Sequence, residues 1–455
     1  MSAPTPLDAT LRDDVDHAEP WFRESLRTLV EYPTISPGGG HRDAIVEGVD
    51  AAAAAIRAAG GRAEVVETTG TPAVIGGFEH PRARTSILIY NHLDVQPADP
   101  EQWTRGEPFR MRVTEDAERH VVYHGRGTTD DKGPALCALA AARIVHALDL
   151  PIDVRFIWES EEEVGSPHFR EVVAGHREAL RADGVVVSDT IWPSATQPAI
   201  STGLRGALQA MLRLETARQQ AHSGLVGGVA RNPVRELCAL ATAIDGARFW
   251  REDVVPSDAR EIASFAASGF DPDYFQEAHG LTKLETRVPL EMMLRLWARP
   301  TFEVHGLVGG YSGPGIMSTV PARAELKVSF RLVPDQDPER IAERLRAFVA
   351  AENPDVEVEL LGRLRPYRAD VGGALHGAIA TAMGNAFGRD PVLVREGGSI
   401  GAVPILVEEL GVPVHFLPLS LPEHGYHAPD ECFDWRQARG GIEAFARTFE
   451  TLATA

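Results

Sequence analysis

The segment Val154-Arg-Phe-Ile-Trp158 is followed directly by Glu159-Ser-Glu-Glu-Glu163, so a mostly apolar run ends in a cluster of acidic residues. A short apolar run of this kind is typical of a strand buried on both faces of an α/β sheet. An acidic cluster taken alone is most often a solvated turn. This one follows the carboxyl end of a predicted buried strand, which is the edge where open α/β sheets place their sites.

Two further apolar runs have the same property. Ser86–Tyr90 leads into Asn91-His92-Leu93-Asp94, and Val185–Val187 leads into Ser188-Asp189. Because the carboxyl ends of parallel strands meet at one edge of a sheet, the three runs predict one convergent site built from acids and a histidine.

The pattern changes after about residue 206. The run Ala324–Leu332 alternates apolar and polar residues, which predicts a half-exposed strand, and a helical pattern over 341–349 leads to a second alternating run at Val356–Leu360. From about residue 365 the chain returns to glycine-rich loops and apolar runs. We therefore expect an α/β catalytic domain with a mixed, mostly parallel sheet, residues 1–205 and 364–455, interrupted by an inserted α+β domain, residues 206–363.

Composition excludes several classes of function. The 455 residues are 44% hydrophobic and 24% charged, as in a soluble globular protein, and the net charge of -20 disfavours nucleic acid and anionic membranes as partners. The chain shows no apolar leader and no window long enough to span a bilayer, so we expect a cytoplasmic protein. Its three cysteines lack CxxC spacing, which excludes a disulfide framework and a thiolate zinc site.

The remaining candidates for metal binding are carboxylates and histidines. They are His92, Asp94, Asp130, Asp131, Glu162, Glu163, Asp189 and a late histidine in the stretch His424-Gly-Tyr-His427. Nitrogen and oxygen ligands without sulfur suit zinc, manganese or cobalt, and the histidines disfavour calcium and magnesium. So many carboxylates would repel one another without cations. The surplus suits two ions bridged by a shared carboxylate, roughly 3.5 to 4 Å apart.

The order of these residues resembles a known family. The motifs are His92-x-Asp94, Gly125-Arg-Gly-Thr-Thr-Asp130-Asp-Lys-Gly133, Glu162-Glu-Val-Gly-Ser166, Asp189 and His427-Ala-Pro-Asp-Glu431. Together they are similar to the co-catalytic zinc exopeptidase family of carnosinase, carboxypeptidase G, aminoacylase and succinyl-diaminopimelate desuccinylase. The stretches His92–Pro97, His222–Gly224, Arg331–Pro334 and Arg395–Ile400 resemble the carnosinase-like dipeptidase branch.

The resemblance implies a role for each residue of the centre. His92 and Asp189 would bind one metal ion, which is zinc in the family, Glu163 and His427 would bind the other, and Asp130 would bridge both. Family members also have a cis peptide bond after the bridging aspartate.

Two acidic residues would serve catalysis instead of binding metal. Glu162 takes the place of the general base, which removes a proton from water at the metal centre. Glu159 and Glu161 offer alternative registers for that role, but the family pattern Glu-Glu-x-Gly-Ser selects Glu162. Asp94 would orient the imidazole of His92.

Substrate binding in the family comes from the inserted domain, which acts as a ferredoxin-like lid and dimerisation domain. His222 would reach the developing oxyanion across a homodimer interface, and Arg331 would pair with the substrate carboxylate. Gly398 and Ser399 would line the same carboxylate pocket. The sequence departs from the family pattern at Asp430 in the last motif and at Gly401-Ala402. The second departure lies beside the carboxylate pocket and bears on substrate identity more than on reaction type.

The resulting prediction is a dinuclear metal hydrolase that cleaves dipeptides. One alternative is an N-acyl amino acid deacylase with the same metals and base, and another is a degenerate module that only binds metal. The presence of both Glu162 and Asp94 favours an enzyme. The sequence leaves the choice among zinc, manganese and cobalt open, as well as the preferred side chains.

Overall fold

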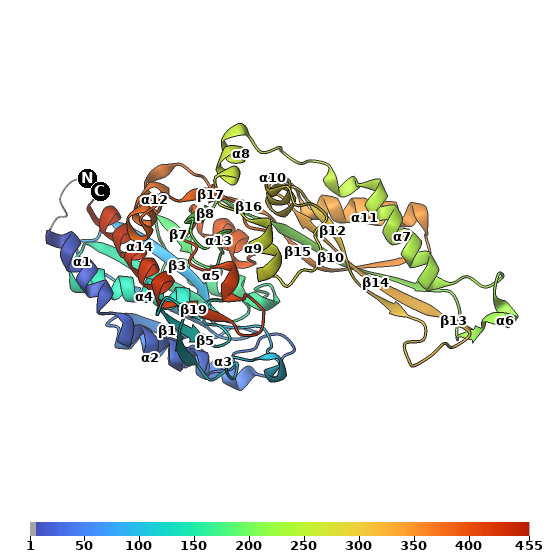
Figure 1. Cartoon of the computed structure of the whole chain (residues 1–455), viewed down its shortest axis with the longest axis horizontal. Coiled ribbons are helices and arrows are strands. Elements are labelled where there is room, and N and C mark those ends of the chain that lie inside the picture. The colour runs from blue at the N-terminus through green and yellow to red at the C-terminus, as the bar shows by residue number, and fades with distance from the viewer. Residues whose placement is uncertain (1–5, 455) are drawn as a thin grey trace.

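The computed structural model describes residues 6–454 and is elongated, with two separate sheets along its length (Figure 1). The first sheet has six strands in the order β1-β2-β6-β3-β7-β18. Its strands are β1 (Arg62–Val66), β2 (Ala73–Phe78), β3 (Thr85–His92), β6 (Ile152–Glu159), β7 (Gly184–Val187) and β18 (Val414–Phe416). The pairs β6–β3, β3–β7 and β7–β18 are parallel, and the pairs that involve β2 are antiparallel. The sheet is therefore mixed, and its parallel strands include all three predicted apolar runs.

Helices cover both faces of this sheet, which explains why its central strands are continuously apolar. Ile87 and Ile89 pack into one layer of the core, whereas Leu88 and Tyr90 pack into the other. The first layer holds α1 (Pro6–Asp16), α2 (Glu19–Val30), α3 (Arg42–Ala58), α4 (Lys132–Ala147), α12 (Gly373–Phe387) and α14 (Trp435–Thr454). The second layer holds α5 (Phe169–Gly175) and α13 (Ala402–Leu410).

The second sheet is antiparallel throughout, with the order β12-β14-β10-β15. It consists of β10 (Gly206–Glu215), β12 (Thr301–Gly309), β14 (Arg323–Leu332) and β15 (Glu357–Leu364), with α7 (Pro233–Ala247) after β10 and α11 (Pro338–Glu352) after β14. This connectivity matches the ferredoxin-like β-α-β-β-α-β arrangement. One face of the sheet packs with both helices into a core of its own, and β14 alternates buried and more exposed residues as its sequence predicts.

Short strand pairs connect the two halves of the chain. They are β8 (Ala199–Ser201) with β17 (Val392–Val394), β9 (Gly203–Leu204) with β16 (Tyr367–Arg368), and the three-stranded group β4 (Arg112–Glu115), β5 (Val121–His124) and β19 (Cys432–Asp434). The pair β11 (Ala221–His222) with β13 (Thr319–Val320) and the helix α6 (Ser223–Val226) lie at the far tip of the second sheet (Figure 1). Helices α8 (Ala259–Ala266), α9 (Pro272–Ala278) and α10 (Pro289–Met293) lie between α7 and β12 along the chain. Within residues 6–454, none of the helices combines the length and apolar character needed to cross a membrane.

Candidate metal centre

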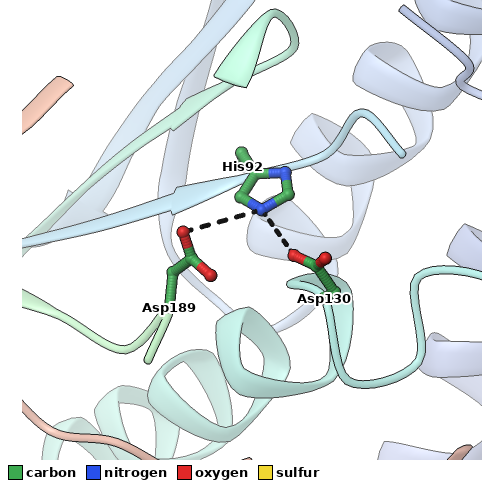
Figure 2. Close-up of side chains that lie close together, drawn as sticks. All are labelled: His92, Asp130 and Asp189. Atoms are coloured by element: carbon green, nitrogen blue, oxygen red, sulfur yellow. Dashed lines mark hydrogen bonds and ion pairs between the residues drawn. The ribbon is translucent and has the colours of Figure 1, made fainter. Parts of the chain in front are cut away.

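The two carboxylate oxygens of Asp130 face two different histidines. Oδ1 lies 3.0 Å from Nε2 of His92, and Oδ2 lies 3.0 Å from Nε2 of His427. Asp189 completes the first group, with Oδ2 3.9 Å from Nε2 of His92 (Figure 2). Glu163 completes the second, with Oε2 3.1 Å from Nε2 of His427. In each group of three the donor atoms lie within 4.8 Å of one another, and Asp130 belongs to both groups.

The first sheet brings these side chains together. His92 is the last residue of β3, Asp189 follows β7, and Glu163 lies in the 3-10 turn η2 (Glu162–Val164) after β6. Since β6, β3 and β7 are parallel neighbours, all three residues reach the same edge. Asp130 lies just before α4, and the peptide bond that follows it is cis, as the family resemblance implies.

The charge of the site suits divalent cations. Burial raises the pKa of Asp189 and of Glu162 well above the usual carboxyl range, and the neighbouring carboxylates add to both shifts. Burial also acts on Asp130, but its hydrogen bonds with both histidines outweigh that effect and lower its pKa. Buried carboxylates in such numbers are costly as ions unless cations compensate them. The donor set therefore fits two divalent ions with nitrogen and oxygen ligands.

Asp94 supports the acidic turn more directly than it supports His92. Its carboxylate accepts the backbone N–H groups of Glu162 at 3.1 Å and of Glu163 at 3.0 Å, and the hydroxyl of Ser36 at 2.6 Å. Nδ1 of His92 lies 3.0 Å from the backbone carbonyl oxygen of Asp94, but 3.5 Å from its carboxylate. The main chain of Asp94 thus makes the closer contact with the imidazole, while its side chain fixes the turn that carries Glu162 and Glu163.

The other two acids of the cluster make structural contacts. Glu159 is buried and accepts hydrogen bonds from the hydroxyls of Tyr90 at 2.6 Å and Ser166 at 2.8 Å. Glu161 contacts Nδ1 of His168 at 2.8 Å and accepts the N–H of Thr71 at 3.2 Å. Neither residue belongs to a candidate ligand group, whereas Glu163 does.

Glu431 connects the two loops that supply Asp130 and His427, and sequence reasoning assigned it no role. Its fully buried carboxylate accepts Nη1 of Arg126 at 2.8 Å. It also accepts the backbone N–H groups of Gly127 at 3.0 Å, Thr129 at 3.0 Å and Asp130 at 3.2 Å. Gly127 adopts a φ of 88°, and a Cβ there would lie 2.8 Å from the side chain of Val95, so glycine is required for this tight loop. The position of Glu431 at the end of the His427-Ala-Pro-Asp-Glu431 motif was the sequence signal that could have identified it.

The predicted carboxylate-binding residues also lie together. Nη1 of Arg331 donates to the hydroxyl of Ser399 at 3.1 Å, near the end of β14. The carbonyl oxygen of neighbouring Gly398 accepts the N–H of Arg205 at 2.9 Å. A cavity of about 850 Å³ is lined by Gly398 and by His427. It therefore connects the loop that contains Gly398 to the metal-ligand loop, which is the loop that carries His427.

His222 is the one predicted site residue that the fold holds away from the others. It is exposed, and its Nδ1 accepts the N–H of Gly224 at 3.0 Å at the start of α6. Helix α6 is at the tip of the second sheet, at the opposite end of the molecule from the sheet that bears His92 (Figure 1). His222 therefore does not reach the metal centre of its own chain in this conformation.

Comparison with known proteins gives one consistent result. The model of peptidase family M20/M25/M40 matches residues 88–451, a range that includes every residue of both candidate ligand groups. Rat Beta-Ala-His dipeptidase is 28% identical over 399 residues, which cover 84% of this chain and 80% of the rat protein. The Cys-Gly metallodipeptidase of Candida albicans is 28% identical over 453 residues, 93% of each chain. The structure of human carnosine dipeptidase 1 superposes with a TM-score of 0.85 at 26% identity over the full length of both chains.

We predict that Glu431→Gln weakens metal binding. The substitution removes the charge opposite Arg126 and places an amide NH₂ among N–H donors, so the loop that positions Asp130 loses part of its support. Loss of such a supporting contact typically costs about 10- to 100-fold in metal affinity. Competition with a chromophoric chelator measures that affinity. The matched control is Asp430→Asn. Asp430 accepts hydrogen bonds from Thr104 at the surface, whereas the N–H groups of the loop that positions Asp130 are bound by Glu431. Equal metal affinity in the two variants would contradict the role assigned to Glu431.

Proposed function

The chain belongs to peptidase family M20/M25/M40, and we propose that it is a dipeptidase that acts at a centre of two divalent ions. The observation that carries the proposal is the position of Asp130, whose two oxygens face separate donor groups. His92 and Asp189 would hold one ion, Glu163 and His427 the other, and Asp130 both. The donor set suits zinc, with manganese or cobalt as alternatives. When bound, such ions polarise the scissile carbonyl and lower the pKa of water.

Glu162 is the proposed general base. Asp94 fixes its backbone, and Glu162 belongs to neither candidate ligand group, whereas the side chain of Glu163 is 4% exposed and is tied to Gln96 and His427. Glu162 is thus free to accept the proton of the attacking water and to pass it to the leaving amine.

Arg331, Ser399 and Gly398 would bind the substrate carboxylate. The guanidinium of Arg331 already makes a hydrogen bond with Ser399, so a carboxylate would meet a positioned pair of donors. A carboxylate site beside the metal centre suits a substrate whose scissile bond lies one residue from its carboxyl end, as in a dipeptide. A free amino terminus distinguishes this proposal from the N-acyl amino acid deacylase alternative.

Residues 206–363 are proposed to act as a lid and as the dimerisation domain. Strand β12 is an edge strand, and Val304 and Val308 on it are 50% and 56% exposed. At the tip, Leu225, Val229 and Ile316 are 85%, 91% and 96% exposed. An apolar edge strand of this kind is usually covered by a partner. A homodimer would cover this surface and bring His222 of the partner subunit to the metal centre, where it would stabilise the oxyanion.

The proposal places the enzyme in the cytoplasm. Cys137, Cys238 and Cys432 are free thiols, of which Cys238 is exposed. Free thiols are typical of proteins that work in a reducing compartment.

We predict that Glu162→Gln lowers kcat by about 10² to 10⁴ while two metal ions per subunit remain bound. The amide preserves the shape of the side chain but cannot accept a proton. Steady-state kinetics on a dipeptide and elemental analysis of the purified protein measure the two quantities. The matched control is Glu161→Gln, the adjacent acid with structural contacts only, which should lose far less activity. Near-normal turnover in Glu162→Gln would remove Glu162 as the base.

We predict a preference for substrates with a free amino terminus. Alanyl-alanine and N-acetylalanine both carry the carboxylate that Arg331 would bind, but only the first has an α-amino group. For a dipeptidase, kcat/KM should be at least about tenfold higher for alanyl-alanine, which corresponds to about 1.4 kcal/mol in the transition state. A preference for N-acetylalanine would establish the deacylase alternative.

We predict that two inactive variants complement each other when mixed. In a heterodimer of Glu162→Gln and His222→Ala, one of the two sites has an intact base and receives an intact histidine from the partner. Random subunit exchange should restore about a quarter of the wild-type activity. A mixture of Glu162→Gln with Glu163→Gln is the control and should restore none, because both changes affect the centre of their own chain. Absence of recovery in the first mixture, with exchange verified by mass, would show that His222 does not act in trans.

A further inference from the structure

The cavity beside His427 has an aromatic wall that the metal centre does not use. The cavity measures about 850 Å³. Its aromatic lining residues are Trp192, Phe270, Tyr274, Phe275, Trp297 and Tyr426. Trp192 and Tyr426 lie close in sequence to the candidate ligands Asp189 and His427, whereas the other four come from the segment between α7 and β12.

This aromatic wall is held in place against the metal-ligand loop. Helix α9 packs against the turn η5 (Pro422–His424), which leads to His427. Asp271 caps α9 by accepting the N–H groups of Asp273 at 2.8 Å and Tyr274 at 3.4 Å. The wall is therefore positioned by the fold at the edge of the metal centre.

Three of these rings, those of Phe270, Phe275 and Trp297, form a connected set that lines the cavity. The Phe270 ring lies 5.3 Å from that of Phe275 and 6.2 Å from that of Trp297, and Trp297 packs edge-on against the fully buried Phe265. Phe270 and Phe275 remain half-exposed, although they line the cavity. Aromatic rings at such separations favour a further ring in offset or edge-to-face contact.

The same cavity also has a polar part. Arg205, Glu396, Gly397 and Gly398 line it there, next to the proposed carboxylate site. A dipeptide bound by its carboxylate near Gly398, with its peptide bond at the metal centre, would lie along this cavity. One of its side chains would then face the aromatic wall.

We propose, on the basis of the dipeptidase function above, that this wall selects dipeptides that contain an aromatic residue. The ring of the substrate would stack with Phe270 and Phe275 and remove their exposed faces from water. A small side chain would leave those faces hydrated. The same chemistry serves an aromatic residue in the first or in the second position, and the two arms of the experiment separate these cases.

The test compares kcat/KM for four dipeptides with the metal-loaded enzyme. Phenylalanyl-glycine is measured against alanyl-glycine, and glycyl-phenylalanine against glycyl-alanine. The wild-type enzyme should prefer the aromatic member of one pair by about tenfold or more, the range that apolar pockets provide. In Phe275→Ala, kcat/KM for that aromatic substrate should fall about tenfold further than for its small counterpart.

The matched control is Phe348→Ala. Phe348 is also a half-buried aromatic residue, but it packs against Phe249 in the core of the second sheet. Its truncation should leave the ratio between aromatic and small substrates at the wild-type value. Phe275→Leu, which removes the ring but keeps an apolar side chain, should give an intermediate ratio and carries the comparison if Phe275→Ala does not accumulate.

The outcomes separate this inference from the proposed function. Hydrolysis of all four dipeptides without an aromatic preference would overturn the inference and leave the dipeptidase function intact. An equal loss on every substrate in Phe275→Ala would likewise overturn it, because a merely structural role predicts that result. Failure to hydrolyse any of the four dipeptides would reject the dipeptidase function itself.

Discussion

The mutual repulsion of buried carboxylates is the constraint on which the site depends. Asp130, Glu163 and Asp189 meet at one sheet edge with only two imidazoles among the candidate ligand groups. Holding carboxylates together in a region of low dielectric is unfavourable unless the scaffold is rigid and cations compensate the charge. Parallel strands supply part of that rigidity, because β6, β3 and β7 end side by side.

Loops supply the other ligands, and buried acids hold those loops in place. Glu431 gathers the backbone N–H groups around Asp130, and Asp94 gathers those of the acidic turn. In both cases a carboxylate outside the two candidate ligand groups accepts a hydrogen bond from the backbone of a residue that belongs to one of them. The negative charge that would otherwise add to the repulsion is thus directed toward N–H dipoles and, for Glu431, toward Arg126.

The sequence predicted those parts of the structure that depend on local pattern. The run Val154–Trp158 is a buried strand because helices cover both faces of its sheet, and its acidic end marks the site. The connection between Glu431 and Asp130 spans about 300 residues, and no local pattern reveals which N–H groups a distant carboxylate accepts. The aromatic wall was missed for the same reason, since Phe270 and Phe275 become neighbours of His427 only through packing of α9. His222 was placed by family resemblance, and only the structure shows its distance from the centre of its own chain.

Adjacent residues can serve different roles because of the turn that carries them. In a 3-10 turn successive side chains point about 120° apart, so Glu162 and Glu163 cannot face the same partner. Asp94 accepts one N–H from each, which fixes the rotation of the turn. Glu163 then points into the candidate ligand group, where His427 and Gln96 hold it, and Glu162 is left outside that group. The carboxylate of Asp94 therefore helps to determine which of the two acids points into the candidate ligand group.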